Sequence, residues 1–244
     1  MLHRNPLLSL PGVSITSFLI DVLHCFYLGI VQQWEMKVLW LLFSENVWRT
    51  ASHKLSLIRF RHEIAKYYRR NRERGFTKVQ MVTMKMIGSE DKPGTTPFKG
   101  KEAKDLIQFF VEMLQMHRPK NCEDLLLAGL YLRRVVHLLD VSPLVPAPHV
   151  VQEIHRATIK FLVHGLNGGV HPIAKTHQAT HIGEQVRLHG NLKHSANFLD
   201  ESMNQEVAGI AGKAYSSVWC SRIFVSWKQL KRRMPRGWVL GPED

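Results

Sequence analysis

Asp21 and His24, in the segment IDVLH, are the first side chains of the sequence whose types and spacing could do chemistry together. They lie three residues apart at an expected junction between a strand and a helix. A carboxylate in that position is a common metal ligand, and a histidine one turn later could orient it or bind the metal too. The alternative is that Asp21 caps the helix beginning at Val22 while His24 packs against it.

His177 and His181 form a second pair, with His171 and His189 nearby. A spacing of four residues places both imidazoles on one face of a helix, as in many zinc sites. Gln178 stands where a zinc protease of the His-Glu-x-x-His type has its glutamate, which disfavours a zinc hydrolase. A packing or hydrogen-bonding role is the alternative for these histidines.

Acidic residues make a third candidate in the segment NFLDESMNQEV, where Asp200 and Glu201 are adjacent and Glu206 follows one turn later. Carboxylates on a helix can complete a two-metal site for phosphoryl transfer, in which two ions about 4 Å apart stabilise the attacking and leaving oxygens. Equally, Asp200 can cap a helix with Glu201 in its first turn.

Basic residues are concentrated in two stretches of a chain whose formal net charge is +13. Residues 54–78 hold nine Lys or Arg against only Glu63 and Glu73. One-sided charge of this kind indicates contact with phosphates, and about six such contacts would give a salt slope near −5 on duplex DNA. The residues predicted to bind nucleic acid are Arg59, Lys66, Arg69, Arg70, Arg72, Arg74, Lys231, Arg232 and Arg233.

The elements that must position these residues are mostly helices, because apolar residues recur at helical spacing along most of the chain. One buried strand is expected over residues 14–20, and an entirely helical chain is the alternative. The stretch 123–139 is apolar nearly all round, which predicts a central position. Helices are expected over residues 22–43, 52–74, 101–117, 123–139, 151–164, 175–188, 199–215 and 221–234.

Composition excludes several classes of protein. A chain of 244 residues with 45% hydrophobic side chains can bury the core of one or two ordinary domains. Three widely spaced cysteines provide neither a disulfide framework nor a cysteine zinc site, which indicates a reducing compartment. We expect a nuclear or otherwise intracellular protein that is not secreted. No membrane span is expected, because the apolar window over residues 18–43 contains Asp21, Glu35 and Lys37. Signatures of nucleotide-driven enzymes and serine hydrolases are lacking.

Three segments, taken in order, resemble parts of eukaryotic cut-and-paste transposases of the CACTA, hAT and KDZ groups. They are LIDVLHCFYLGIVQ, AKTHQATHIGEQVRLHGNL and FLDESMNQEVAGIAG. Asp21 and His24 are similar to an Asp-or-Cys-x-x-His element of those families. The glutamate of the families falls on Glu201, although Asp200 and Ser202 differ from its usual neighbours. Matches to the second segment are Lys175, His177, His181, Arg187, Gly190, Asn191 and Leu192.

The resemblance implies a mainly α fold with minor β structure, in which a helical insertion is attached to a partial RNase H-like α/β core. Residues 1–50 would hold part of the core, residues 51–170 the insertion, and residues 171–244 the C-terminal core helices with Glu201 and a basic tail. Only 20 residues precede Asp21, so the chain resembles the C-terminal part of such a catalytic domain.

The function implied is that of a transposase-derived protein that binds DNA, with ancestral cleavage and strand transfer dependent on Mg²⁺ or Mn²⁺. Glu201 and Asp21 would be metal ligands and His24 would support them. Two divalent ions need carboxylates from several elements to displace their hydration, and the resemblance gives this chain an incomplete Asp, Asp, Glu triad, so we expect no strand cleavage from this chain alone. Self-association is compatible with this interpretation. The alternative is a non-catalytic helical module that binds nucleic acid or a protein.

Overall fold

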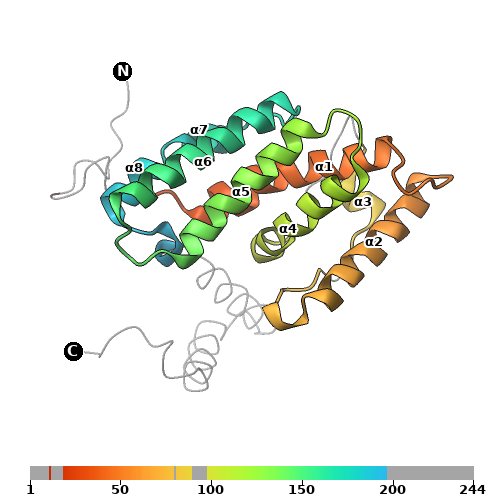
Figure 1. Cartoon of the computed structure of the whole chain (residues 1–244), viewed down its shortest axis with the longest axis horizontal. Helices are drawn as coiled ribbons and strands as arrows, with labels where there is room; N and C mark the ends of the chain where they lie inside the picture. The colour runs from red at the N-terminus through yellow and green to blue at the C-terminus, as the bar shows by residue number, and fades with distance from the viewer. Residues whose placement is uncertain (1–10, 12–18, 80, 90–97, 197–244) are drawn as a thin grey trace, which may run out of the picture. The chain divides into compact units, whose positions relative to one another are not determined.

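The computed structural model describes residue 11 and residues 19–79, 81–89 and 98–196 (Figure 1). The chain divides into two units, residues 1–196 and 197–244, and all the described residues belong to the first. This part is mainly helical, as predicted. Leu19 and Ile20 are the described residues of the predicted strand, and neither is in a strand. The RNase H-like core therefore stays a prediction.

The predicted helix over residues 22–43 is confirmed, but its first half is wound as a π-helix. The π-helix η3 (Leu23–Val31) continues directly into α1 (Gln32–Ser44). Its buried residues include Phe26, Tyr27 and Val31, because η3 packs against α4, α7 and α1. Because η3 has helices packed against several of its sides, it carries apolar side chains on several sides.

The helix α2 (His53–Arg70) begins where the Ser52 side chain accepts a hydrogen bond from the Leu55 amide at 3.4 Å. The 3₁₀ turn η4 (Arg72–Arg74) follows, and Gly75 ends the segment with a φ of 62°. One face of α2 buries Phe60, Ile64 and Tyr67, and the opposite face is polar and exposed. The short helix α3 (Met84–Ile87) comes next.

Three longer helices form the rest of the core: α4 (Gly100–His117), α5 (Glu123–Val141) and α6 (Pro148–Asn167). Helix α5 packs against both α4 and α6, which confirms its central position (Figure 1). The prediction that α5 is buried on all sides is wrong, however. Arg133, Arg134 and His137 are exposed, because the third side of α5 is not covered by α4 or α6.

The predicted helix over residues 175–188 is divided into α7 (Ala174–Thr180) and α8 (Ile182–His189), with the break at His181. Both helices pack against α6. A Cβ atom added to Gly183 would lie 2.5 Å from the Cβ of His155, so α8 approaches α6 very closely there. The 3₁₀ turn η5 (Leu192–Ser195) completes the described part. None of its helices is long and apolar enough to cross a membrane.

Candidate nucleic-acid interface

Asp21 lies at the start of the first helix and acts there as a cap. Its Oδ1 accepts a hydrogen bond from the Leu23 amide at 2.9 Å, and its backbone carbonyl accepts one from Cys25 at 2.8 Å. Its Oδ2 contacts Nδ1 of His24. These contacts match the capping alternative. Glu201, the other predicted metal ligand, lies outside the described residues.

The second segment of the transposase resemblance packs directly against the first, although some 150 residues separate them. Nζ of Lys175 donates a hydrogen bond to the Leu28 carbonyl at 3.2 Å, and the Cys25 thiol lies 3.5 Å from the Lys175 carbonyl. The Gln185 side chain accepts a hydrogen bond from the Ile20 amide at 3.2 Å. Burial raises the pKa of Cys25 to about 11, so this thiol stays protonated and unreactive at neutral pH.

Gly190 and Asn191 hold the connection between α5 and α6. The Asn191 side-chain amide donates to the carbonyls of Leu139 and Ser142 at 2.8 and 2.9 Å, and its backbone amide donates to Leu144 at 2.7 Å. Gly190 has a φ of 80°, and an added Cβ would lie 2.4 Å from the Leu144 oxygen. Gly190 and Asn191 therefore position the connection between the two helices.

The four histidines of the second candidate do not converge. The rings of His177 and His181 are 5.1 Å apart on the surface, and Nδ1 of His181 lies 3.7 Å from a carboxylate oxygen of Glu184. His171 is exposed, whereas Nε2 of His189 is buried and has no hydrogen-bond partner among the residues that the structure describes. Within the described residues no group of three or more His, Cys, Asp or Glu side chains could hold a metal ion.

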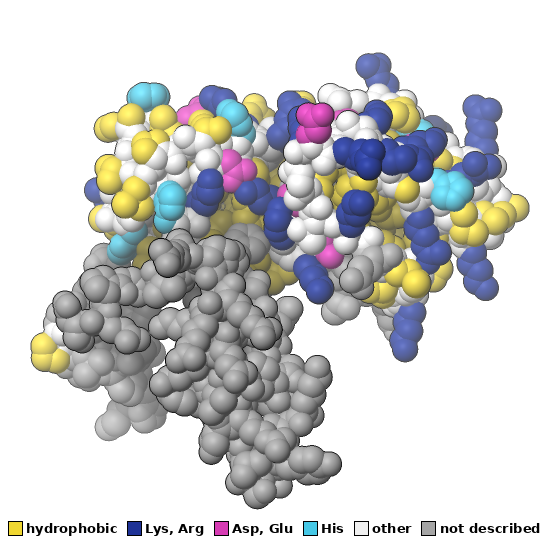
Figure 2. Space-filling view, turned by 90° about the horizontal axis from the view of Figure 1, so that it is seen from below, with side chains coloured by type: hydrophobic (Ala, Val, Ile, Leu, Met, Phe, Trp, Pro, Cys, Tyr) yellow, Lys and Arg dark blue, Asp and Glu magenta, His cyan; other side chains and the backbone are white. Residues whose placement is uncertain are grey.

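The basic stretch of residues 54–78 forms an exposed surface on α2 and η4, which we call the α2 basic face. Its members that were predicted to bind nucleic acid are all exposed: Arg59, Lys66, Arg69, Arg70, Arg72 and Arg74. Figure 2 shows that Lys and Arg side chains are far more numerous than Asp and Glu on the side of the molecule in view. Lys231, Arg232 and Arg233 lie outside the described residues.

Local ion pairs neutralise only part of the α2 basic face. Lys66 pairs with Glu63 at 2.8 Å, and Arg70 pairs with Glu112 at 3.0 Å. Arg59, Arg69, Arg72 and Arg74 have no carboxylate partner among the described residues. Arg61 has a structural role instead, because its Nε donates to the Val82 carbonyl at 2.8 Å. A hollow of about 400 Å³ opens on the face beside Lys66, Arg69 and Met116.

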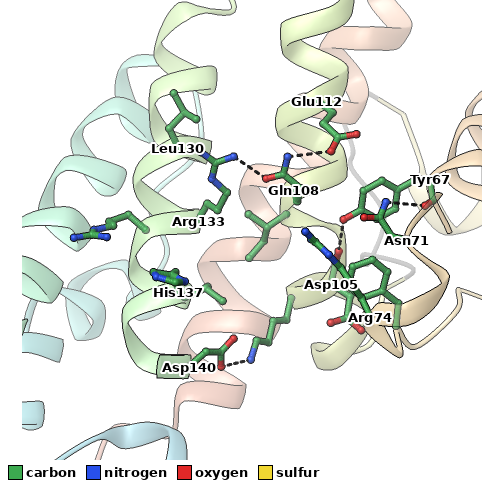
Figure 3. Close-up of a pocket in the computed structure, with 15 residues that line it drawn as sticks. Tyr67, Asn71, Arg74, Asp105, Gln108, Glu112, Leu130, Arg133, His137 and Asp140 are labelled. Carbon is green, nitrogen blue, oxygen red and sulfur yellow. Dashed lines mark hydrogen bonds and ion pairs between the residues drawn. The ribbon is translucent and has the colours of Figure 1, made fainter. Parts of the chain in front are cut away.

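A larger groove of about 640 Å³ lies between the C-terminal end of α2 with η4, helix α4 and helix α5 (Figure 3). We call it the α5 groove. Arg133, His137 and Asp140 line the α5 side, where spacings of four and three residues place them on one face of the helix. Gln108 of α4 lies between the two sides, and Arg74 and Phe76 line the side that follows α2.

The carboxylates that line the α5 groove already have cationic partners. Lys101 lies 3.1 Å from Asp105, and Arg70 contacts Glu112. Asp140 lies 2.5 Å from Nζ of Lys104. Arg133 has no carboxylate partner among the described residues, and its Nη1 donates to the Gln108 side chain at 2.8 Å. The unneutralised charge of the groove is therefore positive.

Sequence analysis missed the α5 groove, because 123–139 was interpreted as a buried helix. The available signal was the spacing of Arg133, His137 and Asp140, which interrupts the apolar pattern on one face of that helix. No comparable pattern in the sequence indicates that Phe76 lines the groove. Phe76 stacks on Tyr67 with ring centroids 5.5 Å apart and planes 8° apart, and this contact depends on how the chain turns after η4.

Comparison with known proteins assigns no family to this chain. No protein-family model, no curated protein and no solved structure matches it significantly. The resemblance of three segments to cut-and-paste transposases therefore stays a prediction.

Proposed function

We propose that this protein binds the phosphate backbone of DNA through the α2 basic face. The observation that supports this most directly is that Arg59, Arg69, Arg72 and Arg74 are exposed without a carboxylate partner in the described part of the chain. A protein surface that only contacts water usually carries both positive and negative side chains. A surface that carries mostly positive side chains binds phosphates more strongly.

The geometry of α2 suits an extended polyanion better than a single small anion. Arg59 and Arg70 are separated by about 16 Å along the helix axis at a rise of 1.5 Å per residue. Lys66 and Arg69 lie between them. A duplex carries about one negative charge per 1.7 Å of its axis, so a row of this length contacts several phosphates at once.

The proposal includes descent from a cut-and-paste transposase, supported by the order of the three segments. In that proposal Glu201 is a metal ligand for Mg²⁺ or Mn²⁺, and Asp21 and His24 support the site. We expect DNA binding without strand cleavage. A nick in duplex DNA that requires Mg²⁺ or Mn²⁺ and is lost in Glu201→Ala would show that the chain is a catalyst.

The test of DNA binding is the affinity for a labelled duplex measured over a range of salt concentrations. Arg59→Gln/Arg69→Gln removes two charges that have no carboxylate partner in the described part of the chain. The matched control Lys160→Gln/Arg187→Gln removes the same charge from exposed positions of α6 and α8 that likewise have no carboxylate partner there. The first variant should bind more weakly and reduce the slope of log affinity against log salt by about 2. The proposal would be contradicted if the test variant and the control variant bound the duplex with the same affinity and the same slope of log affinity against log salt.

The second candidate function is a helical module that binds an acidic protein surface. Exposed apolar side chains on the same helix favour it, because Leu55 and Ile58 are 46% and 44% exposed. Weak binding to duplex DNA together with a loss of protein binding in Leu55→Ser/Ile58→Ser would support this candidate over the first.

A further inference from the structure

We infer that the α5 groove is a nucleotide-binding site, which shares only Arg74 with the α2 basic face. The groove combines three features that a nucleotide needs: cations for its phosphate, an accessible aromatic ring for its base, and room for both. Its volume of about 640 Å³ lies within the range of roughly 300–1,000 Å³ of small-molecule sites.

The phosphate would contact Arg133 and His137, which are one turn apart on the α5 side of the groove. Both side chains are exposed. The hydrogen bond from Arg133 to Gln108 holds the guanidinium over the groove and uses one of its five N–H donors. Gln108 is itself fixed, because its amide donates to Glu112 at 3.0 Å. Arg133 is therefore oriented before a ligand arrives, and it keeps donors for a phosphate.

Carboxylates in the groove do not repel an anionic ligand as strongly as their number suggests. Asp105 also accepts a hydrogen bond from the Thr77 amide at 2.9 Å, and Nζ of Lys193 approaches Asp140 to 3.9 Å. With Lys101, Arg70 and Lys104 these contacts place a cation beside each of the three carboxylates. The charge left for a ligand is that of Arg133 and Arg74.

The base would pack against Phe76, which lines the groove. Arg74, two residues earlier in the chain, lies across the groove from Arg133 (Figure 3). Tyr67 is fully buried behind Phe76 and stacked on it, whereas Phe76 is only half-buried. The accessible part of this aromatic pair therefore belongs to Phe76. Aromatic rings beside cations are the elements with which proteins hold nucleotides of single strands, and they tolerate any base.

Two sources of this ligand share the same chemistry: a free nucleotide, and one nucleotide of a single strand. The test measures direct binding of thymidine monophosphate by calorimetry, and of a fluorescent oligothymidylate of about 12 nucleotides by anisotropy. Arg133→Gln and Phe76→Leu remove the two proposed contacts in turn. Lys160→Gln on α6 is the control, and thermal unfolding checks that each variant is folded.

We expect Arg133→Gln and Phe76→Leu each to weaken binding by about tenfold, and Lys160→Gln to leave it unchanged. If both probes lose affinity, the groove takes a free nucleotide. If only the oligonucleotide binds and loses affinity, the groove takes a strand. If Arg133→Gln binds both probes as tightly as the unmodified protein does, or if neither probe binds, the inference is wrong.

This outcome is separable from that of the DNA-binding proposal. Arg59→Gln/Arg69→Gln should weaken duplex binding and leave thymidine monophosphate binding unchanged. Arg133→Gln should weaken the binding of thymidine monophosphate. It should change the affinity for duplex DNA by less than about threefold, because Arg133 contributes at most one phosphate contact to the duplex. Either site can therefore fail while the other is retained.

Discussion

Gly129 of α5 lies directly against the indole ring of Trp34 in α1. A Cβ atom added to Gly129 would lie 2.5 Å from Cζ2 of that ring and 2.8 Å from a methyl group of Val111. Trp34 is fully buried, and its Nε1 donates a hydrogen bond to the Leu125 carbonyl at 2.9 Å, one turn earlier on α5. The ring therefore cannot move away without losing that hydrogen bond.

Gly129→Ala should accordingly lower the free energy of unfolding by about 1–3 kcal/mol, as overpacked cores do. The matched control is Gly165→Ala in α6, where the added Cβ has no neighbour nearer than 3.8 Å. It should gain up to about 1 kcal/mol from helix propensity. Denaturant unfolding measures both, and equal stability of the two variants would contradict the assigned contact between α1 and α5.

The buried amide of Asn191 should contribute to stability through its two hydrogen bonds to the end of α5. Asn191 is 2% exposed, so Asn191→Ala leaves the carbonyls of Leu139 and Ser142 without that donor. We expect a loss of about 1–3 kcal/mol. Asn167→Ala, at an exposed position near the end of α6, is the control. A loss no larger than in the control would show that Asn191 does not hold the α5–α6 connection.

Glu35 should make the protein less stable as the pH rises. Its side chain is fully buried in α1, neither carboxylate oxygen has a hydrogen-bond partner in the described part, and burial raises its pKa well above the usual range. Below the ordinary carboxyl pKa both the folded and the unfolded chain carry the proton. Above it only the unfolded chain releases the proton, so the free energy of unfolding falls until the raised pKa is reached.

Glu35→Gln removes this titration, and thermal unfolding between about pH 4 and pH 8 measures the result. The gain in Tm of the variant over the unmodified protein should increase with pH. Glu45→Gln, an exposed position just after α1, removes the same charge and serves as the control. A gain that stays constant across this range would mean that Glu35 is ionised in the folded protein.

The role of Asp21 as a cap can be separated from a role as a metal ligand. Asn also caps helices well, so Asp21→Asn should keep most of the stability, whereas Asp21→Ala should lose about 1 kcal/mol. Thermal unfolding with and without Mg²⁺ measures both roles. If Mg²⁺ raises the Tm of the unmodified protein and not that of Asp21→Asn, Asp21 is a metal ligand as the transposase resemblance implies.

Local sequence determined the helices and the position of the α2 basic face. Ser52 and Gly75 bracket the predicted segment, and the structure starts α2 after Ser52 and ends the following turn at Gly75. Apolar residues at helical spacing indicated the buried side of α2 in part, because Ile64, Tyr67 and Tyr68 are buried whereas Leu55 and Ile58 are exposed. The basic residues of α2 and η4 that were predicted to bind nucleic acid are exposed. Capping and periodicity act within a few residues, so one segment carries all the information they need.

Tertiary packing decided the features that join distant segments. The approach of Lys175 to Leu28 joins segments that lie far apart in the sequence, and the local apolar pattern indicated neither the π-winding of η3 nor the break at His181. The α5 groove is the clearest case, because Phe76 and Arg133 belong to segments that no local pattern connects. A helix follows from hydrogen bonds along one segment, whereas a groove depends on the distance and angle at which whole helices pack, and these are set by side chains throughout the core.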